Sequence, residues 1–443
     1  MKTKTKTKTL DPPLLRAMIA YDNGLVVYKP PPKLSLIAWA DRYRRVAAKT
    51  SASPGRWKTV SQPIAFGPMD AVTDPDTHKI SIMAGTQILK TELLLNCAGY
   101  FIHQDPSPIL LVQPTQGAAA SFSKERFMPT VEATPALRAQ IKLPKYRDSE
   151  NTIAHQGYTG GSIDFVGANS PTDLSSRPKR IILCDEIDKW PVSAGAEGDP
   201  LKLSEERAST WAAVGRAKFV RTCSPTVEGF SRIGREYAAS DQRRCYVRCA
   251  YCDHDQVLTW AHVHWDRDES NGHLPDTAAI CCEECGVIWT ERDRINALDA
   301  LKDAPGYGWR QTRSFNCCGE THTPTTWDDR GRSVCPSCEQ PAPYDGHAGF
   351  HASKLYSKRH RLPEIVREFL EAKGDQELMR KFTNTALAEL WTQQYAATFD
   401  VNALMLRAEV YSPDALPEVV QIVTGFCDVQ GDRLEVQFVG VGP

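Results

Sequence analysis

The sequence has no apolar run close to the roughly 20 residues that a membrane-spanning helix requires, so we expect no membrane partner. Its first ten residues are basic, and because no apolar stretch follows them, we expect no secretory signal. Hydrophobic residues make up 41% and charged residues 24% of the chain, which argues against collagen-like, coiled-coil and mostly disordered proteins. A length of 443 residues allows about two to three domains.

The chain also has little net charge, but that charge is unevenly placed. The 53 Lys and Arg against 54 Asp and Glu leave −1 overall. Residues 1–60 hold 13 basic and 3 acidic residues, so they carry +10 and the remainder carries −11. We interpret residues 1–60 as a basic arm followed by a helix, Leu36 to Ala48. The arm would meet DNA or a small partner subunit, and a solvated Lys-Thr tail is the plainer alternative for its first residues.

Cysteine is scarce outside one segment, because nine of the 14 cysteines lie in residues 249–338. Clustered C-x-x-C pairs in a long chain without a secretory signal favour metal ligands in a reducing compartment over disulfides. Two such pairs are separated by 29 residues, and their four thiolates would complete a tetrahedral Zn²⁺ site: Cys249, Cys252, Cys282 and Cys285. Cys281, which adjoins the second pair, is interpreted as a spare thiol.

A second zinc site is predicted further along the chain. Cys335 and Cys338 form another C-x-x-C pair, and Cys317 and Cys318 are the nearest partners. Two adjacent cysteines cannot form the usual two-residue knuckle, so His322 stays open as a replacement ligand, and unligated structural cysteines stay open as the alternative. Neither set leaves a position for a reactive water, so both sites would be structural rather than catalytic.

Glycine is missing where a phosphate-binding loop normally carries it. The segment Ala84-Gly85-Thr86-Gln87-Ile88-Leu89-Lys90-Thr91 follows a predicted strand, Lys79–Met83, and opens a helix, as GxxxxGK[ST] does. Ala84 and Leu89 occupy the two glycine positions. The chemistry still fits nucleotide binding, because backbone N–H groups can hold phosphate, Lys90 can neutralise the β- and γ-oxygens and Thr91 can hold Mg²⁺. A Lys-Thr pair at an ordinary helix start is the alternative.

Paired acids end another apolar run. Asp185 and Glu186 follow the strand-like stretch Arg180–Cys184. In a P-loop ATPase the Asp holds Mg²⁺ and the Glu polarises the attacking water, and two acids at one strand end need a shared cation unless one is protonated. An ordinary strand that leaves into an acidic turn is the alternative.

A polar turn follows the next run, Lys218–Thr222. Ser224 and Thr226 flank a proline there, and hydroxyl groups at such a strand end can sense the γ-phosphate. A plain Ser-Pro turn is the alternative.

The remaining pattern divides the chain into further segments. Apolar runs alternate with helical stretches over residues 61–240, which predicts an α/β layer fold. Residues 241–345 have Cys pairs, short strands and no long helix. Residues 346–415 contain a further strand and a helical connector, with an interrupted apolar face over 363–393. Residues 419–442 read as strand, turn and strand.

Taken in order, these stretches resemble the large subunit of lambda-type (GpA family) phage terminases. The resemblance covers almost the whole chain from Trp39 onward. It rests on an ordered set of short stretches, among them Gln87 through Thr91, Asp185-Glu186-Ile187-Asp188, Ser224-Pro225-Thr226, Phe382-Thr383-Asn384-Thr385 and Asp428-Val429-Gln430. The family implies an ASCE-type P-loop ATPase core with an inserted zinc-ribbon element, a helical connector and a carboxy-terminal nuclease of RNase H-like fold.

The resemblance also assigns roles to individual residues. Lys90, Thr91 and Asp185 would be the phosphate and Mg²⁺ residues, and Glu186 the catalytic carboxylate. Ser224 and Thr226 belong to the motif that couples hydrolysis to movement. Candidates for an arginine that acts across a subunit interface are Arg126 and Arg207.

The function that the resemblance implies is a DNA-packaging motor. Such a subunit hydrolyses ATP and moves duplex DNA into a procapsid in the host cytoplasm, with ATP, Mg²⁺ and Zn²⁺ as cofactors. Its partners would be a small terminase subunit, a portal protein and further copies of the same chain. A non-catalytic zinc-ribbon DNA-binding or assembly protein with a decayed P-loop is the alternative. A helicase-like ATPase is disfavoured because no second motor domain is recognisable.

The nuclease part departs from the family pattern. Asp428 matches the first metal-binding acid, but two-metal cleavage of DNA needs further carboxylates to hold metals ~3.5–4 Å apart. Only 15 residues follow Asp428, and Asp432 and Glu435 are the only acids among them. We therefore expect residues 416–443 to be the start of an incomplete nuclease domain, and we expect no DNA cleavage by this polypeptide alone.

Overall fold

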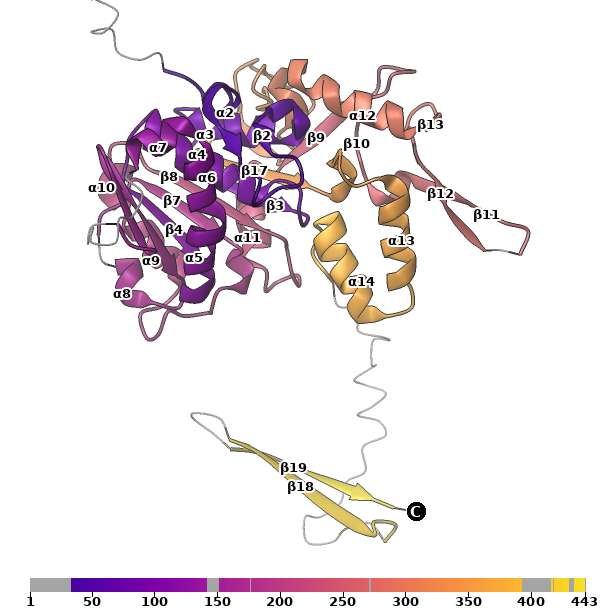
Figure 1. Ribbon diagram of the computed structural model, residues 1–443. Helices are drawn as coiled ribbons and strands as arrows, with labels where there is room; N and C mark the ends of the chain where they lie inside the picture. Colours follow the sequence, from indigo (N-terminus) through magenta and orange to yellow (C-terminus); the bar gives the residue numbers. More distant parts are fainter. Residues whose placement is uncertain are drawn as a thin grey trace, which may run out of the picture. The chain divides into compact units, whose positions relative to one another are not determined.

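The computed structural model describes residues 33–141, 151–175, 177–270, 272–392, 416, 418–429 and 434–442 (Figure 1). The chain forms two compact units, Met1–Thr392 and Gln393–Pro443. Most of the predicted basic arm and the end of the predicted connector lie outside the described residues. No helix among the described residues is long and apolar enough to cross a membrane.

A ten-stranded sheet forms the centre of the first unit (Figure 1). Its strands follow the order β10-β9-β17-β3-β8-β7-β4-β6-β5, with β14 paired to β9. The strands from β9 to β6 are parallel to one another, and β5, β10 and β14 pair antiparallel. The bounds are β3 (Lys79–Ala84), β4 (Ile109–Gln113), β5 (His155–Tyr158), β6 (Gly161–Gly167), β7 (Ile181–Asp185), β8 (Lys218–Cys223), β9 (Arg243–Arg248), β10 (Asp255–Val257), β14 (Trp309–Arg310) and β17 (His347–Ala352).

Strand β8 lies between β3, which leads into the expected phosphate loop, and β7, which ends in the paired acids. Met83 is in register with Cys223, and Asp185 is in register with Thr222. Because parallel strands end at one edge of the sheet, the three loops that follow β3, β7 and β8 emerge side by side, which is where α/β sheets bind ligands.

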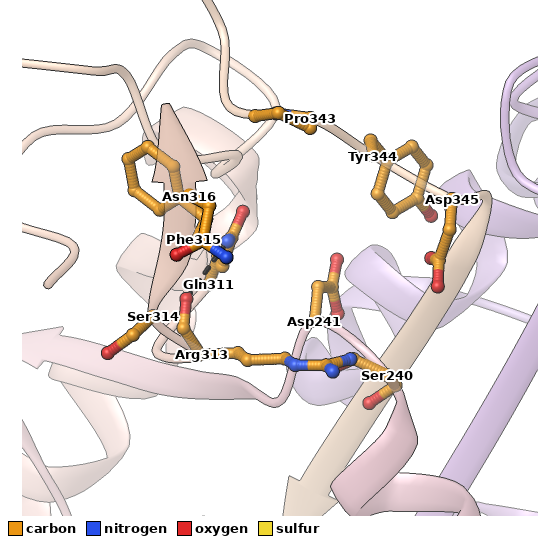
Figure 2. Close-up of a pocket in the computed structure, with 10 residues that line it drawn as sticks. All are labelled: Ser240, Asp241, Gln311, Arg313, Ser314, Phe315, Asn316, Pro343, Tyr344 and Asp345. Atoms are coloured by element: carbon orange, nitrogen blue, oxygen red, sulfur yellow. Dashed lines mark hydrogen bonds between the residues drawn. The ribbon is translucent and has the colours of Figure 1, made fainter. Parts of the chain in front are cut away.

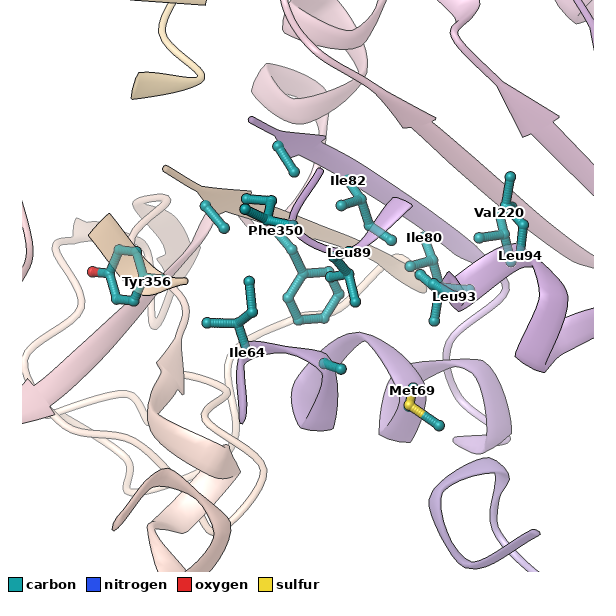
Figure 3. Close-up of a cluster of buried hydrophobic side chains, with 14 of the residues drawn as sticks. Ile64, Met69, Ile80, Ile82, Leu89, Leu93, Leu94, Val220, Phe350 and Tyr356 are labelled. Atoms are coloured by element: carbon teal, nitrogen blue, oxygen red, sulfur yellow. The ribbon is translucent and has the colours of Figure 1, made fainter. Parts of the chain in front are cut away.

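Helices cover both faces of the sheet, because alternate strand residues point to opposite faces. Ile80 and Ile82 pack in one core with α2–α7, and Figure 3 shows them beside Leu93 and Leu94 of α4. Cys184 and its neighbours pack in a second core with α8–α11. The helices are α2 (Leu36–Tyr43), α3 (Phe66–Thr73), α4 (Lys90–His103), α5 (Gln116–Phe122), α6 (Met128–Ala133), α7 (Pro135–Gln140), α8 (Pro171–Ser175), α9 (Pro200–Glu206), α10 (Ser209–Ala212) and α11 (Arg232–Ala239).

The helix expected over Leu36–Ala48 is shorter in the structure. Helix α2 ends at Tyr43, and Arg45–Val46 forms strand β1, paired with β2 (Gly55–Arg56). The physical reason lies in Arg44, whose side chain is buried and donates to Glu92 and Thr130 at 3.2 Å each. A guanidinium buried this deeply needs its hydrogen-bond partners, and an extended backbone at Arg44 brings it to them.

The cysteine-rich region contains a helix that the sequence did not indicate. Helix α12 (Glu291–Ala300) is capped by a reciprocal pair of hydrogen bonds between Thr290 and Asp293, so the expectation of no long helix here was wrong. The remaining elements are short. A three-stranded sheet contains β11 (Val263–Arg267), β12 (His273–Cys281) and β13 (Ile288–Trp289), and a hairpin contains β15 (Phe315–Cys317) and β16 (Glu320–His322). In Figure 1 the β11–β12 hairpin extends away from the body of the unit.

The predicted connector consists of α13 (Leu362–Ala372), α14 (Gln376–Phe382) and a π-helix, η9 (Thr383–Leu387). The helix breaks at Gly374, whose φ of 95° is a conformation that favours glycine. Aromatic side chains join the connector to the base of the β11–β12 hairpin. The ring centroid of Trp260 lies 5.1 Å from the ring centroid of Phe369 and 5.2 Å from that of Phe382.

The second unit contains two antiparallel strands, β18 (Ile422–Val429) and β19 (Leu434–Val441), which confirms the two predicted strands, whereas the predicted turn between them lies outside the described residues. Asp428 and Glu435 are paired in their register. Their side chains and Asp432 lie outside what the structure describes. A metal at Asp428, and the expectation that this chain alone does not cleave DNA, therefore stay predictions.

Candidate functional site

The loop after β3 is held by the end of β17 and by the π-helix η9 of the connector. The Gly85 N–H donates to Ala352 O at 3.0 Å, and the Thr86 N–H donates to Thr385 O at 2.9 Å. A Cβ atom added to Gly85 would lie 2.8 Å from the same Thr385 oxygen. Gly85 stands one residue after the first glycine position of the motif, which Ala84 occupies. It has a steric reason to be glycine, because a side chain there would displace the Thr385 carbonyl.

Lys90 is the first residue of α4, and its buried side chain joins three segments. Its ammonium donates to Ala84 O at 3.4 Å and to the Ser224 hydroxyl, and it lies 3.3 Å from Oε1 of Glu186. Ser224 in turn donates to Ala84 O at 2.9 Å. The structure thus brings the predicted lysine, carboxylate and hydroxyl together at the edge of the sheet. Thr91 follows, half-buried, as the second residue of the helix.

Asp185 ends β7 with a buried carboxyl group. Thr222 donates its hydroxyl to Oδ1 at 2.8 Å, and Gln113 donates its amide to Oδ2 at 3.1 Å. Burial, and then the charge of Glu186, raise the pKa of Asp185 above its ordinary value. Such an acid favours a proton unless a cation lies beside it. The sequence did not single out Gln113 or Thr222 as site residues, and the register that brings their strands beside β7 is the feature that shows them.

Glu186 has a left-handed backbone conformation with a φ of 52°, which is uncommon for a residue with a side chain. Its N–H donates to Thr222 O at 2.8 Å. Its carboxylate lies 3.3 Å from Lys90 and 3.0 Å from Lys189. Burial acts to raise the pKa of Glu186, but these two positive charges outweigh it and leave the pKa below its ordinary value. The adjacent acids therefore differ, with Glu186 ionised and Asp185 ready for a cation.

The two hydroxyls of the Ser-Pro-Thr turn have different surroundings. Ser224 contacts Lys90, whereas Thr226 is exposed and donates to Oδ2 of Asp188 at 2.8 Å. The same carboxylate accepts from the Ser231 hydroxyl at 2.6 Å and from the Ile233 N–H at 2.8 Å. Asp188 therefore joins the paired-acid segment to the turn and to the start of α11.

The two candidate arginines lie apart from this group. Arg126, in the π-helical segment η3 (Ser123–Phe127), donates to Thr50 O at 3.5 Å, and Arg207 donates to Ser175 O at 2.8 Å. Within the described residues neither side chain contacts Lys90, Asp185 or Glu186.

The sequence did not indicate a small recess beside the phosphate loop. Gln62, Gln87 and Tyr356 line it, and Oε1 of Gln62 is buried without a hydrogen-bond partner in the described part of the chain.

A separate hollow of about 450 Å³ lies between Asp241, Phe315 and Tyr344 (Figure 2). The Asp241 carboxylate in that hollow already accepts hydrogen bonds from Arg243 at 2.7 Å and from the Gly349 N–H at 2.9 Å. We therefore interpret it as a structural residue that joins β9 to β17.

The first cysteine set has the geometry of a four-thiolate metal site. All four sulfur atoms of Cys249, Cys252, Cys282 and Cys285 lie within 4.8 Å of one another, at 3.9 Å for Cys249 to Cys285 and 3.8 Å for Cys252 to Cys282. Sulfurs that each lie about 2.3 Å from one tetrahedral ion are about 3.8 Å apart. Burial acts to raise the pKa of Cys249, but N–H groups of the knuckle donate to its sulfur and lower the pKa to about 7. Cys281 lies outside the set, as expected.

The second set is formed by Cys317, Cys318, Cys335 and Cys338, again within 4.8 Å. The sulfur of Cys317 lies 3.8 Å from that of Cys318 and 3.7 Å from that of Cys338. Adjacent cysteines can share a site because Cys318 and Gly319 form the tight turn of the β15–β16 hairpin, with φ values of 54° and 83°. His322 is not a member, since its Nε2 lies 3.1 Å from the Cys317 carbonyl oxygen.

The chain has an α/β fold in which lysine, carboxylate and hydroxyl side chains meet at the carboxyl edge of the parallel strands. Residues 51–303 match the ATPase domain of the phage terminase large subunit gpA, and residues 347–443 match the endonuclease domain of that subunit. The first match covers more than half of the chain, and the chain belongs to the phage terminase large subunit gpA family. The endonuclease match begins at β17, a strand that lies in the ten-stranded sheet.

Two relatives have been compared over most of this chain. It is 24% identical over 439 residues to the terminase large subunit of Enterobacteria phage P21, and 24% identical over 427 residues to that of Escherichia phage lambda. These alignments cover 96% and 94% of this chain but 63% and 62% of the relatives. The chain therefore spans less than two thirds of the length of these relatives.

Two solved structures show a weaker likeness. The ATPase domain of the Thermus phage P74-26 large terminase is 13% identical, with a TM-score of 0.36 over 72% of this chain and 92% of that one. The large terminase of another thermophilic bacteriophage is 14% identical, with a TM-score of 0.27 over 38% of this chain and 39% of that one. TM-scores this low do not relate the folds in detail.

Proposed function

We propose that this chain is the ATP-hydrolysing motor subunit of a DNA-packaging machine, which moves duplex DNA into a procapsid. The observation that carries the proposal is the meeting of Lys90 and Glu186 beside the buried Asp185, at the carboxyl edge of a parallel sheet, in a member of the terminase family. Charge of both signs is concentrated there on a loop and helix start suited to phosphate.

The roles follow from the contacts. ATP would place its β- and γ-phosphates at the loop 84–91, with Lys90 as the neutralising cation. When Lys90 turns toward the phosphates, it releases Glu186, and Lys189 at 3.0 Å remains as the positive charge that favours the ionised carboxylate, which can polarise a water. Ser224 shares the Lys90 ammonium, so its loop responds to the same movement.

The residues present fit a Mg²⁺ ion. Asp185 is a buried carboxyl group with a raised pKa, which a divalent cation would relieve, and the Thr91 hydroxyl is half-buried at the start of α4. Mg²⁺ held by Asp185 and Thr91 would neutralise charge on the phosphate oxygens.

Zinc fits both cysteine sets. Their sulfur separations are those of tetrahedral thiolate sites, and each set provides four ligands. The role is structural. The first set fastens β9 to the three-stranded sheet, and the second closes the β15–β16 hairpin on the Cys335 knuckle.

DNA and the packaging partners belong to the proposal as well. A motor that moves any sequence needs contacts to the DNA backbone, so basic residues rather than base-reading ones should line its path. Arg126 and Arg207 remain candidates for an arginine that reaches the nucleotide of a neighbouring copy, which implies a homo-oligomer. A small terminase subunit and a portal protein would be the other partners, in the host cytoplasm.

A second function is favoured by one observation only. Ala84 and Leu89 replace both glycines of the phosphate loop, as expected in a zinc-ribbon DNA-binding or assembly protein that no longer hydrolyses ATP. The retained contacts of Lys90, Asp185 and Glu186 argue against it.

Binding of ATP with Mg²⁺ to the full chain tests the proposal. Lys90→Ala should weaken binding at least about tenfold and remove hydrolysis, since a phosphate-neutralising charge is lost. Lys302→Ala is the matched control, because that lysine is half-exposed and pairs with its neighbour Asp303. Wild-type chain that binds no ATP, or Lys90→Ala that binds it as tightly as wild type, would overturn the proposal.

A further inference from the structure

The segment Phe382-Thr383-Asn384-Thr385 contributes to the family resemblance but has no role in the site as described so far. It spans the end of α14 and the start of the π-helix η9, which ends at Leu387 with Ala388 in a left-handed conformation (φ 58°). Single π-helical turns are rare and occur frequently at functional sites. This one lies against two of the three loops that form the nucleotide site.

Asn384 fastens this segment to the loop after β8. The side chain is 8% exposed, and its amide nitrogen donates to Thr226 O at 2.8 Å and to Glu389 O at 2.9 Å. The Trp391 N–H donates to the same Thr226 oxygen at 2.9 Å. Both lone pairs of the Thr226 carbonyl are therefore used by residues of one short segment.

The neighbouring residue fastens the segment to the phosphate loop. Thr385 O accepts from the Thr86 N–H at 2.9 Å and stands directly against Gly85. A third contact joins the segment to β17, where His351 lies 2.9 Å from Ala388 O. Burial, together with the charge of Arg244, lowers the pKa of His351 to about 3, so the ring is neutral and its Nε2–H donates to the carbonyl.

We propose that Asn384 is a positioning residue that clamps the Ser224–Glu228 loop to the phosphate loop. The proposal rests on the proposed ATPase function and adds a residue to it. Ser224 contacts Lys90, so a nucleotide that draws Lys90 away changes the support of this loop. Through the Thr226 carbonyl, Asn384 passes that change to the segment that ends at Thr392, the last residue of the first unit.

The plainer explanation is that Asn384 donates hydrogen bonds to backbone carbonyl groups that have no intrahelical partner at the end of a helix. Its hydrogen bond to Glu389 O, within the same segment, is consistent with such helix capping. The bond to Thr226 O is not, because that oxygen lies 158 residues away on a loop that already has the Trp391 partner. A capping role predicts loss of stability alone, whereas a clamp predicts a local loosening of the Ser224–Glu228 loop and slower turnover.

Hydrogen exchange of the full chain separates the two explanations without requiring activity. In Asn384→Ala, peptides covering residues 222–230 should exchange at least about tenfold faster, while peptides from β4 and β7 keep wild-type protection. Asn384→Asp should behave the same way, because it keeps the size and loses both N–H donors. Asn296→Ala, the same change at an exposed position of α12, is the matched control. Wild-type exchange over 222–230 in both Asn384 variants would overturn the clamp.

Kinetics supply the second readout. Asn384→Ala should lower kcat about tenfold or more and leave the KM for ATP within about threefold, because a small misplacement of site groups slows chemistry more than binding. An unchanged kcat with altered exchange would overturn the catalytic part of the proposal. If wild-type chain shows no hydrolysis, the proposed function fails with it, and the exchange experiment still decides whether Asn384 holds the loop.

Discussion

The ammonium nitrogen of Lys90 lies 3.3 Å from a carboxylate oxygen of Glu186, across the intervening strand β8. In this arrangement each residue balances the charge of the other, and neither is free for chemistry. Phosphate offers Lys90 a stronger set of anions, so nucleotide binding and the release of Glu186 become one event. This relationship links ATP binding to the readiness for hydrolysis through residues of the chain itself.

Asp188 should matter for turnover more than for ATP binding. Asp188→Ala removes the acceptor shared by Thr226, Ser231 and the Ile233 N–H. We expect kcat to fall about tenfold and the unfolding free energy to fall by about 1–3 kcal/mol, because the Ser231 hydroxyl and the Ile233 N–H, which belong to buried residues, lose their partner. Urea unfolding and steady-state hydrolysis measure the two effects. Asp303→Ala, at a side chain that is 75% exposed, is the control. Full activity in Asp188→Ala would show that the turn does not depend on it.

Zinc content should follow the two cysteine sets. Native mass spectrometry of the wild-type chain should show about two zinc ions. Cys249→Ser and Cys318→Ser should each lose one, since each belongs to one set of four sulfurs. Cys281→Ser should keep both, because Cys281 lies outside the sets and its thiol donates to the carbonyl oxygens of Cys282 and Gly286. A wild-type chain without zinc, purified under reducing conditions, would count against metal at both sites.

Gly85 should not tolerate a side chain. A Cβ atom there would lie 2.8 Å from Thr385 O and 3.4 Å from Ala386 O, so Gly85→Ala should lower the unfolding free energy by about 1–3 kcal/mol. Gly117→Ala is the matched control, because the nearest atom, Oγ1 of Thr115, lies 3.9 Å away and alanine favours the helix. Chemical denaturation compares the two. Equal stability of Gly85→Ala and wild type would show that the Thr385 contact is loose.

Much of the sheet could be predicted from the sequence. The apolar runs at residues 79–83, 180–184 and 218–222 correspond to β3, β7 and β8, because strands buried on both faces read as continuous apolar stretches. The paired acids and the cysteine sets could be found from spacing alone. Helix α12 was missed because its capping box, Thr290 with Asp293, follows a cysteine-rich stretch whose composition suggested loops.

The parts of the site that the sequence did not indicate depend on distant contacts. Gln113 and Thr222 reach Asp185 because their strands flank β7. Thr385 reaches Thr86 across 299 residues. No local pattern encodes such pairs, since they follow from strand order and from the path of the chain after α14. The early end of α2 has a similar origin, in the buried partners of Arg44.

Phosphate release from ATP, with and without duplex DNA, tests the central claim most directly when wild type is compared with Glu186→Gln. The account predicts turnover in the wild-type chain that duplex DNA stimulates, and a loss of at least about a hundredfold in Glu186→Gln with ATP binding retained. Glu197→Gln, an exposed substitution, should turn over as wild type does. Equal rates in wild type and Glu186→Gln, or ATP binding without any hydrolysis in the wild-type chain, would contradict the account.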